Sequence, residues 1–167
     1  MKLLTLSQGQ FAQVDDEDFE YLNQWKWCAV KYRQFTYASR SIKNKPGARN
    51  RQIMLLMPRI ILNAPKGVMT DHKDGNGLNN QRYNIRNCTN KQNQFNQKPK
   101  RNCSSQYKGV YWSKARNTWM AVIHNKYSGS FKVEKEAAIH YDKLAKEKYG
   151  EFAWLNFPKY IHKRGSL

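Results

Sequence analysis

The stretch that decides the fold is TDHKDGNGLNNQRYNIRNCTNKQNQFN, residues 70–96. It begins at the end of GVMTDH, which is typical of a strand, and YNIRNCT carries a second strand signature. KDGNGLNN lies between them and has the composition of a turn. NKQNQFNQ predicts a short helix capped by Thr89 or Asn90. The stretch therefore predicts a strand, a turn, a second strand and a helix in succession.

The adjacent Asp71 and His72 stand where the first of these strands ends. Successive side chains of a strand point to opposite faces, so these two need an irregular turn if they are to converge. Gly75 and Gly77 are expected to supply that turn through positive φ angles.

The residue types in this stretch match the needs of phosphodiester hydrolysis. His72 could take the proton of an attacking water, because the pKa of histidine lies near neutrality. Asp71 and Asn93 offer the hard oxygen ligands that suit Mg²⁺. Asn84 could bond to the His72 ring and fix its tautomer. The alternative is an Asn-rich loop without catalytic meaning, since such stretches usually form turns.

Charge points to a polyanionic partner. The 167 residues carry 30 Lys and Arg against 12 Asp and Glu, a formal charge of +18, which is far more than solubility needs. Residues 25–167 hold 29 of the basic and 7 of the acidic residues. The other five acids lie in DDEDFE, residues 15–20, where they suit the start of a helix; a carboxylate cluster for a metal ion is the alternative. Nucleic acid is the leading partner.

Other classes are disfavoured. No apolar run approaches membrane-spanning length, and basic residues are interleaved with aromatic ones along the whole chain, so we expect no membrane association. MKLLTLSQGQF is too short for a signal-peptide core, which predicts an intracellular protein. The odd, widely spaced Cys28, Cys88 and Cys103 favour neither a disulfide framework nor a zinc site.

The remaining sequence divides into two structured parts. Upstream, KLLTLSQGQFAQVD predicts one or two strands, DDEDFEYLNQ a short helix and WKWCAVKYRQFTYASRSI a hairpin. RQIMLLMPRIIL predicts a buried segment that Pro58 interrupts. Downstream, a basic linker precedes three short strands, in YKGVYW, TWMAVIH and YSGSF, with a turn at Asn125-Lys126. VEKEAAIHYDKLAKEKYG then has a helical stripe ending at Gly150, and Val133 offers this helix no side-chain cap.

Residues 70–96 closely resemble the ββα-metal motif of HNH endonucleases, in the subgroup with Asp-His first and Asn at the two later positions. The resemblance implies that Asp71 and Asn93 bind the metal, that His72 is the general base and that Asn84 orients it. It extends upstream to FAQVDDEDFEYL and PRIILNAPKGVMTDH, as in small phage and mobile-element members. Pro58 departs from the pattern, because relatives often have His before this Arg.

Residues 107–158 resemble the ethylene-responsive-factor (APETALA-two type) DNA-binding domain. The shared marks are YKGV, the Trp119, Ala121 and Ile123 face of the middle strand, GSF, EAA…Y and NFP. Met120, Val122 and His124 are expected on the opposite, outward face. In that family the sheet enters the major groove. The resemblance implies DNA contacts by Lys108, Tyr111, Lys114, Arg116, His124, Lys126 and Tyr127. Several family arginines are absent here, so we expect a weak sequence preference.

The sequence thus predicts an α+β protein: a β-rich HNH domain at 1–97, a linker at 98–103, a three-stranded antiparallel sheet packed on one helix at 104–158, and a basic tail at 159–167. We expect a metal-dependent DNA endonuclease of the homing or mobile-element type that nicks one strand of double-stranded DNA with Mg²⁺ or Mn²⁺ and needs no small-molecule cofactor. A monomer is expected, with a dimer left open, in the cytoplasm of a bacterial host. A non-catalytic DNA-binding regulator is the alternative, and RNA fits the charge equally well. The complete Asp-His-Asn-Asn set favours the enzyme.

Overall fold

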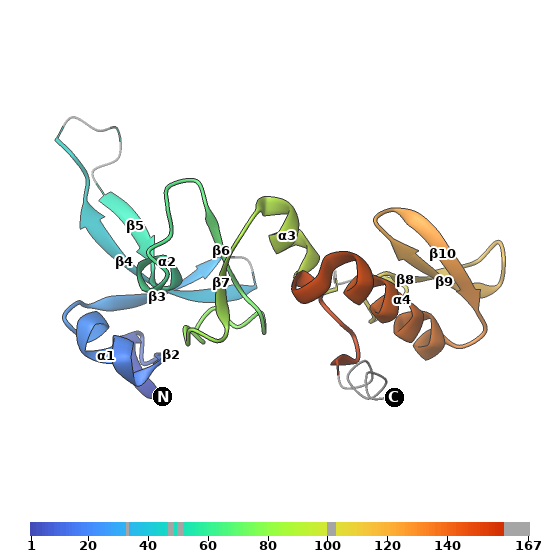
Figure 1. Ribbon diagram of the computed structural model, residues 1–167, viewed down its shortest axis with the longest axis horizontal. Helices are drawn as coiled ribbons and strands as arrows, with labels where there is room; N and C mark the ends of the chain where they lie inside the picture. Colours follow the sequence, from blue (N-terminus) through green and yellow to red (C-terminus); the bar gives the residue numbers. More distant parts are fainter. Residues whose placement is uncertain (33, 47–48, 50–51, 100–102, 159–167) are drawn as a thin grey trace. The chain divides into compact units, whose positions relative to one another are not determined.

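The structure, a computed structural model, describes residues 1–32, 34–46, 49, 52–99 and 103–158. The chain forms two compact units, Met1–Asn93 and Gln94–Leu167, each of mixed α and β structure (Figure 1). The predicted α+β class is confirmed by the mixture of helices and strands in both units. The division falls inside helix α3 (Asn90–Phe95), earlier than the expected boundary after residue 97. The reason is Phe95, whose ring stacks on that of Tyr149 with 3.9 Å between centroids.

A five-stranded sheet forms most of the first unit. Its order is β2-β1-β3-β4-β5, and every neighbouring pair is antiparallel except β1 and β3, which are parallel. The strands are β1 (Lys2–Ser7), β2 (Phe11–Val14), β3 (Trp27–Tyr32), β4 (Phe35–Lys43) and β5 (Gln52–Leu56). The hairpin predicted from WKWCAVKYRQFTYASRSI is confirmed as β3 and β4.

Two helices cover this sheet and close its core. Helix α1 (Asp16–Asn23) starts in the acidic stretch, as expected, and α2 (Met57–Ile61) has Pro58 in its first turn, where proline is tolerated. Pro58 therefore starts a helix, whereas the sequence had predicted an interrupted buried segment. The indole of Trp27 is buried and its Nε1 donates to the Leu22 carbonyl at 2.8 Å. Core side chains include Leu4, Leu6, Val14, Leu22, Trp27, Met57, Ile61 and Ile85.

The decisive stretch folds as predicted in outline. Strands β6 (Met69–His72) and β7 (Ile85–Cys88) form an antiparallel pair, and helix α3 follows directly. The long loop between the strands lies along β2, because Gln13 N donates to Leu78 O and Asn80 N donates to Gln13 O, both at 2.8 Å. This loop is thereby tied to the larger sheet.

The two loop glycines serve different purposes. Gly75 has a φ of 67°, as expected. Gly77 is not at positive φ; a Cβ there would lie 2.3 Å from the Thr36 carbonyl oxygen and 2.5 Å from the Tyr37 ring. The prediction for Gly77 was therefore wrong in its reason: the position requires a small residue because the backbone approaches β4 closely.

The acidic stretch holds the far end of the same loop. Asp15 accepts hydrogen bonds from the backbone N of Arg82 at 2.7 Å and from Nε2 of Gln81 at 3.0 Å. The buried Asp18 pairs with the Arg82 guanidinium at 2.7 Å, and Glu17 contacts the same group. These carboxylates have protein partners, which explains their clustering without a metal ion.

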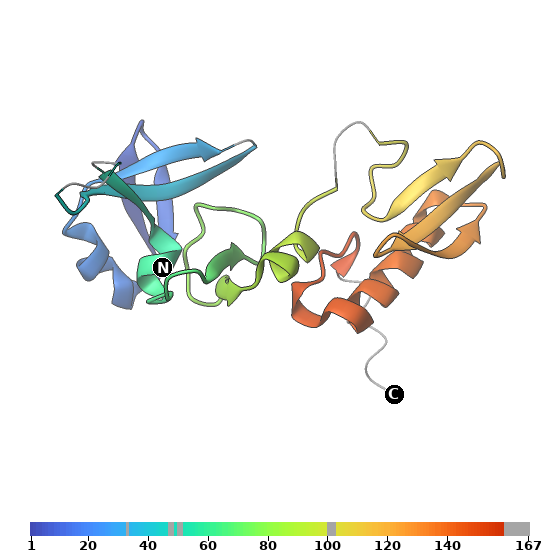
Figure 2. The ribbon, with the colours of Figure 1, turned by 90° about the horizontal axis from the view of Figure 1, so that it is seen from above.

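The second unit has the predicted architecture. Strands β8 (Val110–Ser113), β9 (Thr118–Ile123) and β10 (Lys126–Phe131) form an antiparallel sheet with β9 in the middle. Helix α4 (Glu134–Tyr149) lies along one face of this sheet (Figure 2), and the 3₁₀ turn η1 (Gly150–Phe152) follows. The buried stripe of helix α4 comprises Ala137, Ala138, Tyr141 and Ala145. Gly150 ends the helix at a φ of 56°, and Val133 makes no side-chain cap bond, as predicted.

His124 lies in a turn, outside the strand where the sequence had placed it. His124 and Asn125 have φ angles of 53° and 60°, and Ile123 pairs with Lys126 across them. Two consecutive positive φ angles in a two-residue hairpin loop define a type I′ turn, which follows the twist of its strands. The turn expected at Asn125-Lys126 is thus displaced by one residue. Among the described residues no helix is long and apolar enough to span a membrane.

We expect Gly77→Ala to lower the free energy of unfolding of the first unit by about 2–3 kcal/mol, because the added methyl group overpacks against β4. Gly67→Ala is the matched control: its φ is 86°, but no atom lies within 4 Å of the added Cβ, so about 1 kcal/mol of backbone strain is expected. Urea denaturation followed by tryptophan fluorescence measures both. Equal losses would contradict a steric role for Gly77.

Candidate active site

Strands β6 and β7 place the central side chains. Their register pairs Asp71 with Arg86 and His72 with Ile85, and all four residues are buried. Because side chains alternate along a strand, Asp71 and Arg86 share one face and His72 and Ile85 the other. Ile85 belongs to the core of the first unit, so the face that carries His72 is anchored by apolar packing.

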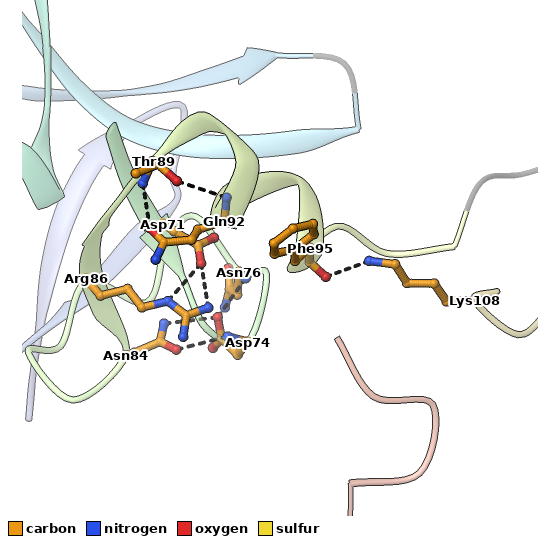
Figure 3. A network of polar contacts seen from close by, with 9 residues as sticks. All are labelled: Asp71, Asp74, Asn76, Asn84, Arg86, Thr89, Gln92, Phe95 and Lys108. Carbon is orange, nitrogen blue, oxygen red and sulfur yellow. Dashed lines mark hydrogen bonds and ion pairs between the residues drawn. The ribbon is translucent and has the colours of Figure 1, made fainter. Parts of the chain in front are cut away.

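Asp71 and Arg86 form a buried ion pair. Oδ2 of Asp71 accepts from Nε of Arg86 at 3.0 Å and from Nη2 at 2.7 Å (Figure 3). Breaking a buried pair leaves an uncompensated charge, which is strongly unfavourable. The sequence assigned no role to Arg86, although opposite charges at a cross-strand position are a recognisable signal once the hairpin register is known.

The His72 ring contacts a residue that the sequence did not single out. Its Nε2 lies 3.1 Å from Oδ1 of Asn80, whose side chain is fully enclosed. The Tyr37 ring of β4 lies on another side, with 6.0 Å between ring centroids. Burial lowers the pKa of His72 below its ordinary value, while the Asn80 bond and nearby carboxylates act in the opposite direction. The lowered pKa favours the neutral ring that a general base requires.

The side chain of Asn84 closes the loop. Its Nδ2 donates to Oδ1 of Asp74 at 3.0 Å and to the carbonyl of Asn79 at 2.8 Å, and its Oδ1 accepts from Asp74 N at 3.1 Å. These bonds use both amide hydrogens of Asn84. The expected contact with the His72 ring is made by Asn80 instead, and the bonds of Asn84 hold the loop.

Asn93 lies on helix α3, whose start is defined by a capping box. Thr89 N donates to Oε1 of Gln92 at 2.8 Å, and Gln92 N donates to Oγ1 of Thr89 at 3.2 Å (Figure 3). Of the two predicted caps, Thr89 is the one observed. Asn93 follows one residue later and is partly exposed. The structure therefore buries Asp71, His72 and Asn84 in the strand pair and its loop, and leaves Asn93 on the adjoining helix.

The donors available for a metal ion are few and hard. Asp71 contributes a carboxylate and Asn93 an amide oxygen, and no group of three or more His, Cys, Asp or Glu side chains among the described residues is arranged to hold a metal. A cation bound here would keep most of its positions for water and phosphate. Mg²⁺ is commonly bound in this way, so the donor set fits it.

The predicted DNA-contact residues of the second unit are mostly exposed. Tyr111 pairs with Met120, and Tyr127 with Val122, so both tyrosines lie on the sheet face opposite to Ala121 and helix α4. Their side chains are 41% and 56% exposed. The Arg116 guanidinium lies 5.7 Å from the centre of the Tyr127 ring. The other exposed members of the set are Lys114, His124 and Lys126.

Lys108 differs from the rest of that set. Its ammonium group donates to the carbonyls of Phe95 at 2.6 Å and Gln97 at 2.7 Å, and burial lowers its pKa to about 8. These carbonyls belong to the end of α3 and the residues after it, so Lys108 caps a helix C-terminus. A phosphate contact would require Lys108 to give up both bonds.

Comparisons with known proteins found similarity to two viral proteins. The chain is 29% identical over 154 residues to an uncharacterized HNH endonuclease of Acanthamoeba polyphaga mimivirus, which covers 90% of this chain and 77% of the relative. It is 36% identical over 95 residues to Protein 3.8 of Escherichia phage T7, which covers 53% of this chain and 76% of that protein. No family model and no solved structure matches.

Lys126→Ala should weaken binding to double-stranded DNA and reduce the slope of log affinity against log salt by about one, as for a lost phosphate contact. Lys108→Ala should leave affinity near that of the wild type and lower the free energy of unfolding of the second unit by about 1–3 kcal/mol, because two carbonyls lose their donor. Fluorescence anisotropy at several salt concentrations and urea denaturation measure the two effects. Lost affinity with unchanged stability in Lys108→Ala would contradict its capping role.

Proposed function

Because the chain belongs to the same family as Protein 3.8 of Escherichia phage T7, and is similar over most of its length to a viral HNH endonuclease, we propose that it is a metal-dependent DNA endonuclease. The observation that carries this proposal is the buried His72, held at Nε2 and set next to the buried Asp71 on β6. Their side chains point to opposite faces of β6, so His72 would act as the base on one face while Asp71 offers its carboxylate on the other. A neutral, oriented imidazole is what water activation for phosphodiester hydrolysis needs.

In this reaction His72 takes a proton from a water molecule, whose oxygen forms a bond to phosphorus. The bond between phosphorus and the leaving oxygen breaks, and that oxygen is protonated by solvent. A Mg²⁺ ion held by Asp71 and Asn93 would stabilise the charge that develops on the phosphate and the leaving oxygen. Asn84 holds the loop in place through Asp74. Each chain has one such site, so a monomer would nick one strand.

Charge supports DNA as the substrate. Residues 21–70 contain ten Lys and Arg and no Asp or Glu. The acids of residues 15–20 that would offset them include Asp15 and Asp18, which are already bound by the loop. We assign the outward face of β8–β10, with Tyr111 and Tyr127, to DNA binding, as its resemblance to ethylene-responsive-factor domains implies. The exposed Lys126, beside the turn that joins β9 and β10, would add a phosphate contact. Tyrosine and lysine favour stacking and phosphate contacts, so the sequence preference would be weak.

Nicking of supercoiled plasmid tests the proposed activity. With Mg²⁺ the wild-type protein should convert supercoiled to nicked plasmid, and a chelator should stop the reaction. His72→Ala should lower the rate by about 10²–10⁴-fold, the usual contribution of a general base, with DNA affinity unchanged. His140→Ala is the matched histidine control: its ring bonds to the Ser128 carbonyl within the second unit, and nicking should proceed at the wild-type rate.

Two results would contradict the proposal. Tight binding without cleavage, on plasmid and on genomic DNA of the host, would favour the non-catalytic DNA-binding regulator. An equal loss of cleavage and affinity in His72→Ala would mean that the imidazole contacts DNA and is not the base.

A further inference from the structure

We infer that Asn80 is the positioning residue of His72: its side-chain oxygen holds the Nε2–H of the imidazole and so places the lone pair of the neutral ring on Nδ1, the atom that takes the proton of water. The inference rests on the proposed function, in which His72 is the base. It assigns to Asn80 the orienting role that the sequence had assigned to Asn84.

The direction of the hydrogen bond follows from the surroundings of the Asn80 amide. Oδ1 lies 3.1 Å from Nε2 of His72, and Nδ2 lies 3.5 Å from the carbonyl oxygen of Gly77. A flipped amide would set its oxygen against that carbonyl, with two acceptors facing each other. Because an amide oxygen can only accept, Nε2 must carry the hydrogen, and the other ring nitrogen carries the lone pair.

Asn80 is held firmly enough to impose this orientation. Its side chain has no exposed surface, and its backbone N donates to the carbonyl of Gln13 on β2 at 2.8 Å. Gln13 N returns a bond to Leu78 O at the same distance. The residue is therefore fixed by the five-stranded sheet, and the His72 ring bonds to a rigid acceptor.

The packing around Tyr37 limits the ring from another side. The Tyr37 and His72 rings are inclined at 46°, and Gly77 approaches Tyr37 so closely that no Cβ fits between them. The loop segment that begins at Gly77 and carries Asn80 thus packs on the same tyrosine as the imidazole. A change in ring orientation would require the segment or Tyr37 to move.

The neighbouring Asn79 provides a matched control. It is also buried, but its side chain bonds to Asp74 at 2.9 Å and to Tyr83 at 3.2 Å. Replacing it damages the same loop without removing the acceptor that faces His72. The two adjacent asparagines therefore separate loop stability from control of the imidazole.

Steady-state nicking kinetics give the first test. Asn80→Leu keeps the approximate volume but removes the acceptor, and we expect kcat to fall by about 10–100-fold, the usual effect of losing an orienting partner, with KM unchanged. Asn80→Asp restores an acceptor oxygen and should recover most of the lost kcat. Asn79→Leu should lower the melting temperature at least as much as Asn80→Leu, with a smaller loss of kcat.

Nitrogen NMR of the histidine rings gives a second readout that needs neither metal nor DNA. In the wild-type protein the neutral His72 ring should be protonated at Nε2, and Asn79→Leu should keep this tautomer. Asn80→Leu should give a mixture of the two tautomers. A wild-type ring protonated at Nδ1, or an Asn80→Leu variant with wild-type kcat, would overturn the inference.

These outcomes distinguish a failure of the Asn80 role from a failure of the proposed nuclease function. If His72→Ala nicks plasmid at the wild-type rate, the proposed nuclease site fails even where the tautomer is as expected. If His72→Ala is inactive while Asn80→Leu is fully active, the nuclease site stands and only the positioning role of Asn80 fails.

Discussion

The paired hydrogen bonds between Asn84 and Asp74 fix the path of the loop between β6 and β7, and the candidate site depends on that path. Asp74 also accepts from Asn76 N at 2.7 Å and from Asn79 Nδ2 at 2.9 Å, so a single carboxylate gathers three parts of the loop. The loop has little apolar surface to bury, and polar side chains take the place of a hydrophobic core. The loop is rich in asparagine because its path is fixed by side-chain hydrogen bonds.

Around this centre, several acids of the first unit are bound by nearby groups of the loop and of β7. Asp15 and Asp18 are bound to the Gln81-Arg82 end of the loop, and Asp71 is bound to Arg86. Carboxylates that are paired in this way contribute little repulsion toward a polyanion. The positive field of the unit comes from its other Lys and Arg residues, such as the ten in residues 21–70, and a field of this sign would attract a polyanion such as DNA.

Features encoded locally were predictable from the sequence. The Thr89 cap, which was one of two candidates, the stop at Gly150 and the uncapped start at Val133 each depend on a few neighbouring residues, and the structure has all three. The shift of the His124 turn by one residue is a small error of the same local kind.

The parts of the site that the sequence did not predict depend on contacts between segments that are distant along the chain. Tyr37 reaches His72 from another strand, and Asn80 rather than Asn84 meets the ring because the loop lies along β2. No periodicity distinguishes two asparagines four positions apart. Lys108 was predicted at the DNA surface from the resemblance to ethylene-responsive-factor domains, and only the fold reveals the carbonyls that it caps.

The contacts of helix α3 limit where the two units of this protein could be exchanged between genes. Its Phe95 stacks on Tyr149, and the Phe95 carbonyl accepts from Trp154 N at 3.1 Å as well as from Lys108. A crossover between genes within residues 98–103 would separate Phe95 from Tyr149, Trp154 and Lys108, the residues that it contacts. An exchange that preserves both modules has its seam before Phe95, inside the helix that carries Asn93. An engineered exchange of either module would therefore have to keep Phe95 with the second unit.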